Sequence, residues 1–154
     1  MRTLRGKNFC VIAGISEKQC LVHFSILRES NNKDTFAEFV RQLIGKIKGE
    51  AVVYMDNYSV HYSKKVKEFF DDSKPRVIQR FLPSYSCILN PIERLWLVVK
   101  EKWKRAMIQN IEGLEDDECV EILKQLLDGE KENCKKLASC HVRFLIKSLN
   151  DKFV

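Results

Sequence analysis

The sequence lacks several features that would place it in a specialised class of protein. It has no apolar run long enough to cross a membrane, and no apolar segment follows its basic first residues as in a secretory signal. It also has no internal repeat and no low-complexity linker. These absences exclude a membrane-spanning or secreted protein and a membrane partner. We expect a nuclear protein in a eukaryotic host and a cytoplasmic one otherwise.

The cysteines lack the spacing of a metal site. No C-x-x-C pair and no zinc-binding spacing occurs among the six, so they do not predict a zinc module. We interpret them as reduced, mostly buried, small apolar side chains, which is how free cysteine usually behaves. They are Cys10, Cys20, Cys87, Cys119, Cys134 and Cys140.

Length and composition indicate one globular domain. Of the 154 residues, 45% are hydrophobic and 31% are charged, the balance of an ordinary folded chain that is long enough to build a core. We expect a single domain over residues 1–154, with a recognisable core at about 7–107 and a helical C-terminal part at about 111–150.

The net charge of +6 hides an uneven distribution. Residues 110–132 contain nine acids and two lysines, so this segment carries −7 and the rest of the chain +13. A basic body suits a polyanion such as DNA, because neutralising phosphates releases counterions. Many basic proteins bind no nucleic acid, so charge alone does not assign this function. The acidic segment itself is typical of a solvated helix face.

Hydrophobic periodicity predicts alternating strands and helices, and hence an α/β fold. Two apolar, β-branched runs separated by Ser16-Glu17-Lys18 predict an antiparallel hairpin. The run Ala51–Tyr54 is nearly all apolar, so we expect a central strand covered on both faces. The expected strands are 7–15, 19–27, 51–55 and 76–82, and the expected helices are 36–47, 63–70, 91–107, 114–127 and 131–149.

Two acids stand at the ends of predicted elements. Asp56 follows the apolar strand, at the carboxyl edge where open α/β sheets place their chemistry. Glu93 lies in the first turn of the helix that Pro91 begins, on a face shared with Lys100 and Lys104. Such positions can hold two carboxylates rigidly beside a shared metal. Alternatively, Glu93 is an exposed glutamate with ordinary helical neighbours. The apolar stripe beside this face consists of Ile92, Leu95, Trp96, Val99, Trp103 and Ala106.

Both acids belong to longer sequence blocks. The first block is Asp56-Asn57 with His61, and the second contains Phe81-Leu82-Pro83, Tyr85-Ser86, Leu89-Asn90-Pro91-Ile92-Glu93-Arg94 and Trp96. Together the blocks resemble the catalytic core of DDE transposases of the mariner superfamily. The second block is nearly continuous and chemically mixed, so chance is a poor explanation. Cys87 and Ile88 stand where that family usually has proline and a polar or acidic residue, which alters the loop but leaves the acids in place.

The resemblance implies an RNase H-like fold, a mixed sheet flanked by helices and followed by C-terminal helices. It implies DNA as partner, with strand cleavage and strand transfer at a two-metal Mg²⁺ or Mn²⁺ site that three acids hold. Asp56 would be the second acid and Glu93 the third, both of them catalytic and metal-binding. Asn57 would be a supporting residue that orients Asp56, and His61 another that fixes the loop or approaches a phosphate. The DNA-binding candidates are Arg94, Lys100 and Lys104.

The first acid of that family should lie on a strand before the hairpin, yet no Asp or Glu precedes Glu17. We therefore expect an N-terminally incomplete transposase domain that lacks its first strand and is inactive or very weak alone. A second interpretation is a DNA-binding or oligomerising module without catalysis. A third is a working nuclease in which another residue, or another transposase chain in a homo-oligomer or split pair, supplies the missing acid.

Overall fold

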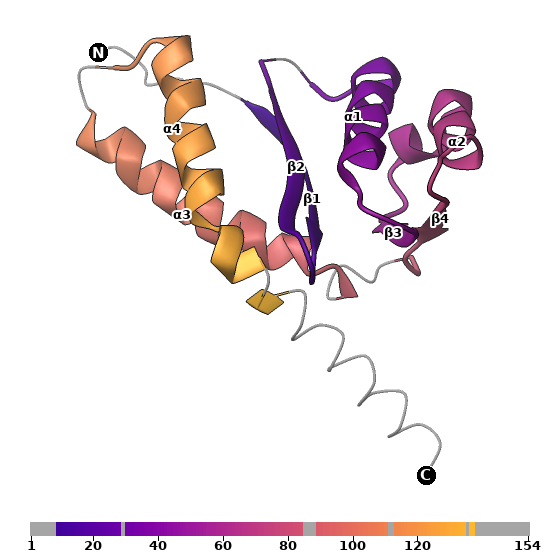
Figure 1. The fold of residues 1–154 in the computed structure, drawn as a ribbon. Helices are drawn as coiled ribbons and strands as arrows, with labels where there is room; N and C mark the ends of the chain where they lie inside the picture. Colours follow the sequence, from indigo (N-terminus) through magenta and orange to yellow (C-terminus); the bar gives the residue numbers. More distant parts are fainter. Residues whose placement is uncertain (1–8, 29, 85–88, 111–112, 135, 138–154) are drawn as a thin grey trace.

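The computed structural model describes residues 9–28, 30–84, 89–110, 113–134 and 136–137, which form a mixed α/β arrangement (Figure 1). The strands are β1 (Cys10–Ser16), β2 (Cys20–Leu27), β3 (Ala51–Met55) and β4 (Val77–Phe81). The helices are α1 (Lys33–Lys46), α2 (Lys64–Asp71), α3 (Ile92–Gln109) and α4 (Asp116–Gly129), with a short 3-10 turn η1 (Ser59–Tyr62). The predicted elements up to residue 129 are confirmed. The last predicted helix, 131–149, lies mostly outside the described residues.

The four strands form two sheets of two strands each. Strands β1 and β2 make the predicted antiparallel hairpin, with Cys10 opposite Leu27 and an irregularity between Gly14 and Ile15. Strands β3 and β4 run parallel, with Ala51 opposite Val77 and Met55 opposite Phe81. The parallel pair brings the carboxyl ends of β3 and β4 to one edge, because paired parallel strands end on the same side.

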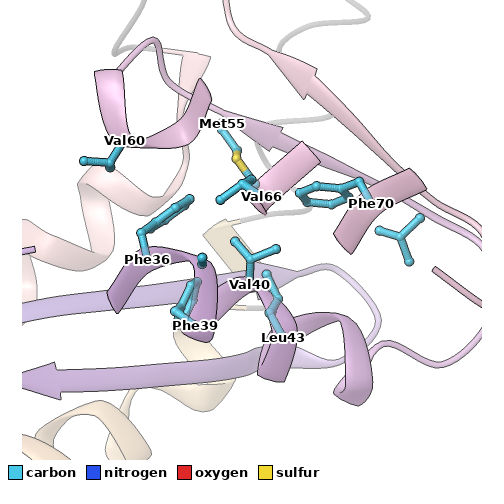
Figure 2. Close-up of a cluster of buried hydrophobic side chains, with 10 residues drawn as sticks. Phe36, Phe39, Val40, Leu43, Met55, Val60, Val66 and Phe70 are labelled. Carbon is cyan, nitrogen blue, oxygen red and sulfur yellow. The ribbon is translucent and has the colours of Figure 1, made fainter. Parts of the chain in front are cut away.

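Helix α1 packs against both sheets. A capping box at Asn32 starts it, because the Asn32 side chain accepts hydrogen bonds from the backbone N–H groups of Asp34 and Thr35. Its buried face joins a cluster that also contains Met55 of β3 and residues of α2 (Figure 2). Ile12 of β1 and Val22 of β2 pack against the same cluster. One helix thus provides apolar contacts for both the hairpin and the parallel pair. The cluster consists of Phe36, Ala37, Phe39, Val40, Leu43, Met55, Val60, Val66, Phe70 and Val77.

A second cluster covers the other face of the hairpin. Leu21 of β2 packs there with Leu95 and Val99 of α3 and with Leu127 of α4. The predicted apolar stripe of α3 is confirmed, since Leu95 and Val99 are buried and the other four members of the stripe are partly buried. Helix α3, which carries Glu93, is therefore anchored on the hairpin.

The prediction that β3 is covered on both faces is wrong. Val52 and Tyr54 are 48% and 65% exposed, whereas Met55 is buried under α1. Residues alternate between the two faces of a strand, so α1 covers one face of β3. Within the described residues, α3 and α4 pack against the hairpin and leave the other face of β3 open. An apolar run cannot distinguish a strand covered on both faces from one covered on a single face.

No cysteine in the described part of the chain belongs to a disulfide, as the sequence indicates. Cys119 and Cys134 are buried, and Cys10 and Cys20 are partly buried. Burial raises the pKa of the Cys134 thiol to about 11. Cys87 and Cys140 lie outside the described residues. Among the helices that the structure describes, none has the length and apolar character needed to span a membrane.

The acidic segment is not solvated throughout. Glu130 is fully buried, where it forms an ion pair with Lys102 of α3 and accepts a hydrogen bond of 2.6 Å from Asn133 Nδ2. Burial works to raise the pKa of Glu130, but the hydrogen bonds from Asn133 and Lys102 outweigh it and hold that pKa below its ordinary value. Glu130 therefore ties the end of α4 to α3, contrary to the expectation of a solvated face.

Gly14 lets the hairpin approach α1 closely. A Cβ atom at this position would lie 2.8 Å from Cδ1 of Leu43, a buried residue of α1. We expect Gly14→Ala to lower the free energy of unfolding by about 1–2 kcal/mol, because overpacking a filled core forces side chains or backbone to shift. Urea unfolding measures the loss. Leu43→Val in the same chain should recover part of it, and a double variant no more stable than Gly14→Ala would contradict the explanation.

Candidate active site

The carboxyl ends of β3 and β4 place two polar loops side by side. The backbone N–H of Leu82 donates to the Met55 carbonyl at 2.7 Å, which continues the pairing of β3 and β4 one step beyond the strands. Asp56 directly follows Met55, so it leaves the sheet next to Leu82. Its side chain is 55% exposed. Asp56 is thus a solvent-accessible carboxylate on a rigid strand end, as predicted from the sequence.

The side chain of His61 contacts Asp56. Its Nδ1 lies 2.9 Å from Asp56 Oδ1 and 3.0 Å from the Asp56 backbone carbonyl oxygen. Both of these oxygens are acceptors, so Nδ1 must carry the proton and donate to them. This arrangement fixes the tautomer of His61 and the orientation of the Asp56 carboxylate, and it leaves Oδ2 to face other groups.

His61 is itself held by the core. Its ring packs on Phe36 of α1 with a centroid separation of 4.3 Å, and its side chain is 14% exposed. Its backbone carbonyl accepts a hydrogen bond of 3.0 Å from Gln79 Nε2 of β4. Tyr58 meets the same ring edge-on at 5.9 Å. The histidine that orients Asp56 is therefore positioned by contacts from α1, from β4 and from Tyr58, the residue before η1.

Asn57 joins the two strand ends. Its Nδ2 donates to the Leu82 carbonyl at 2.7 Å, and its Oδ1 accepts a hydrogen bond from the Tyr62 hydroxyl. The Tyr62 ring stacks on Phe81 of β4 with centroids 4.2 Å apart and planes 11° apart. Asn57 thus fixes the loop after β3 against the end of β4. Its side-chain contacts are with Leu82 and Tyr62, whereas the contact with Asp56 comes from His61.

Glu93 lies in the first turn of α3. Asn90 organises that turn, since its backbone carbonyl accepts from the Glu93 N–H at 3.2 Å and its Oδ1 accepts from the Ile92 N–H at 3.4 Å. An acidic side chain here interacts favourably with the positive end of the helix dipole. Glu93 is exposed, as are Arg94, Lys100 and Lys104 further along α3. Between them, Leu97 is 70% exposed, so this face of the helix is open.

The donor chemistry of Asp56 and Glu93 suits a hard divalent cation, which prefers carboxylate oxygens. Within the described residues, no group of three or more His, Cys, Asp or Glu side chains forms a ready-made metal cluster. Each of the two acids is exposed and could separately offer carboxylate oxygens to such an ion. Sequence reasoning missed Tyr62 and Gln79, because their roles depend on the pairing of β3 with β4.

The sequence of this region also matches a known protein family. A family model described as "DDE superfamily endonuclease" matches residues 2–115, which include Asp56, His61 and Glu93. No curated protein is similar enough to the chain to be matched.

Proposed function

The chain belongs to the DDE superfamily of endonucleases, and on this premise we propose that it is a mariner-type transposase catalytic domain. The substrate would be DNA, and the reaction strand cleavage and strand transfer. The observation that carries the proposal is Asp56, an exposed carboxylate that His61 orients at the end of β3. An RNase H-like fold is supported by α1, which packs on both sheets as one helix would pack on a single larger sheet.

In this proposal Asp56 and Glu93 hold Mg²⁺ or Mn²⁺. A bound ion of this kind would polarise the phosphodiester and promote attack by water or a 3′ hydroxyl. His61 keeps one carboxylate oxygen of Asp56 in a fixed direction, and Asn57 keeps the loop beside β4. Arg94, Lys100 and Lys104 stand exposed on α3, where they can reach phosphates.

Activity of residues 1–154 alone is proposed to be absent or very weak. No Asp or Glu precedes Glu17, so the acid that comes first in this family would have to be supplied by another residue or by another chain. Losing one of three metal-binding acids removes transition-state stabilisation that the remaining two cannot replace. Metal binding is therefore a more direct test than turnover.

Titration with Mn²⁺ or Mg²⁺ by calorimetry tests the two acids. We expect millimolar metal to bind the wild-type chain, and Asp56→Asn and Glu93→Gln each to abolish that binding, because both carboxylates contribute negative ligand oxygens. Asp72→Asn and Glu50→Gln remove exposed acids elsewhere and serve as matched controls that should leave the heat unchanged. If titration of the wild-type chain gives no heat of metal binding, or if both site variants bind metal as the wild type does, the proposed site does not exist.

A second candidate is a DNA-binding or oligomerising module without catalysis. The open face of α3 favours it, because Leu97 is 70% exposed among Arg94, Lys100 and Lys104. DNA binding or self-association that persists with no measurable metal site would support this candidate over the first.

A further inference from the structure

A groove runs along β4 on the side of η1 and α2. It has a volume of about 630 Å³ and is lined by every residue of β4, by Arg76 just before that strand, and by residues of η1 and α2 that include His61, Tyr62 and Lys67. His61 contacts Asp56, and Tyr62 contacts Asn57. The groove therefore begins at the residues that surround the Asp56 carboxylate.

The charged residues of the groove are mainly cations. Lys67, Arg76 and Arg80 line it, whereas Asp71 is its one acid. Among the described residues, none of the three cations takes part in an ion pair of 4.0 Å or less, and Arg80 Nη1 donates to the Gln79 carbonyl at 3.1 Å. Exposed cations that lack acidic partners concentrate positive potential in a hollow and attract a polyanion.

The same groove contains an aromatic platform. One face of the Tyr62 ring lies on Phe81, at a centroid separation of 4.2 Å, while the residue remains 55% exposed. The hydroxyl of Tyr62 donates to Asn57 Oδ1, so the ring is held at both ends. A fixed ring with an exposed face can stack on a planar group such as a nucleobase without losing much further freedom.

We propose that this groove binds single-stranded DNA beside Asp56, with a base stacked on Tyr62 and phosphates on Lys67, Arg76 and Arg80. The proposal rests on the proposed function, since it names the form of DNA that reaches the same acids. Cations that follow a backbone, combined with aromatic rings that stack on bases, are the usual means of binding single strands. A duplex buries the faces of its bases and cannot use the Tyr62 ring in this way.

Fluorescence anisotropy tests the groove. The probes are a labelled oligothymidine of about 12 nucleotides and a duplex of the same length, titrated with the full chain in buffer containing EDTA. We expect tighter binding of the single strand. Tyr62→Ala should weaken that binding about tenfold, because stacking of one base contributes on that order, whereas Tyr62→Phe should retain most of it. Tyr54→Ala removes an aromatic ring that is exposed to a similar extent but lies outside the groove, and it should have no effect.

The salt dependence tests the cations separately. Arg76→Ala combined with Arg80→Ala should reduce the slope of log affinity against log salt by about 1.4, since each phosphate contact on a single strand contributes about 0.7. Lys64→Ala, an exposed lysine outside the groove, serves as the control and should change the slope by less. Thermal melting of each variant verifies that it is folded.

Three results would overturn the proposal. These are equal binding of duplex and single strand, equal losses from Tyr54→Ala and Tyr62→Ala, and binding of an acidic peptide as tightly as the oligonucleotide. The last result would instead indicate an extended peptide paired with the outer edge of β4. The metal-free buffer separates this test from the metal titration, so the groove can fail while Asp56 and Glu93 still bind metal, or the reverse.

Discussion

Replacing Phe36 by alanine should lower the free energy of unfolding by about 3–5 kcal/mol, the usual loss when a buried phenylalanine is truncated. Phe36 is 4% exposed and lies in the cluster that α1 shares with both sheets. Its ring also packs on His61 with centroids 4.3 Å apart. The substitution would therefore remove core contacts and the support of the side chain that orients Asp56. Urea unfolding followed by circular dichroism measures the loss.

Phe36→Leu separates the two effects. Leucine keeps most of the apolar volume, so the loss of stability should be smaller, while the aromatic contact with His61 disappears. We expect this variant to remain folded and to bind Mn²⁺ more weakly than the wild-type chain. Leu97→Ala is the matched control, because Leu97 is 70% exposed and should change neither property. A stable Phe36→Ala chain would show that the cluster does not hold α1 to both sheets.

Replacing Lys102 by methionine should cost about 1–3 kcal/mol of stability, because the buried Glu130 carboxylate would lose a charged partner, although the Lys102 side chain itself is 46% exposed. Glu130 is fully buried and would keep Asn133 as its hydrogen-bond donor. Replacing both members, Lys102→Met with Glu130→Met, should recover most of the loss, since an apolar pair needs no partner charges. Chemical unfolding at neutral pH measures both variants. Arg105→Ala, which breaks an exposed pair with Glu101, should change stability by less than about 0.5 kcal/mol.

The contribution of this pair also depends on pH. The pKa of Glu130 is lower in the folded chain than its ordinary value of 4.5, so the unfolded chain binds the proton more readily. The stabilisation is therefore complete above about pH 4.5 and is lost as the pH falls through the lower folded pKa. The difference in free energy of unfolding between the wild type and Lys102→Met should therefore become smaller in that acidic range. A difference that stays constant down to pH 3 would contradict the assignment.

Local sequence signals were sufficient to predict the strands and helices and the position of Asp56 and Glu93 within them. The apolar run before Asp56 predicts a strand that ends there, and Pro91 with a 3.6-residue period predicts the helix that carries Glu93. These signals are contained within a few neighbouring residues, so the structure reproduces them. The stripe of α3 is a further case, with Leu95 and Val99 buried as its period requires.

Contacts between segments that are far apart in the sequence could not be predicted from such local signals. The stack of Tyr62 on Phe81 requires β3 and β4 to pair in one register, and no local pattern specifies that register. The exposure of Val52 and Tyr54 depends on which distant segments pack on that face of β3. Glu130 stands in a run of acids that suggests a solvated face, yet Lys102 from another helix allows it to be buried. In each case the partner lies far away in the sequence.

The close approach at Gly14 has a consequence for how the sequence can diverge. A side chain at position 14 must take space that Leu43 now fills, so the two positions are expected to vary together. In related sequences, a residue larger than glycine at position 14 should occur together with a residue smaller than leucine at position 43. The other face of the hairpin packs against α3. An uncompensated change at position 14 would therefore shift the helix that carries Glu93. Paired substitution at positions 14 and 43 would thus help to keep Glu93 in place, although neither residue contacts it.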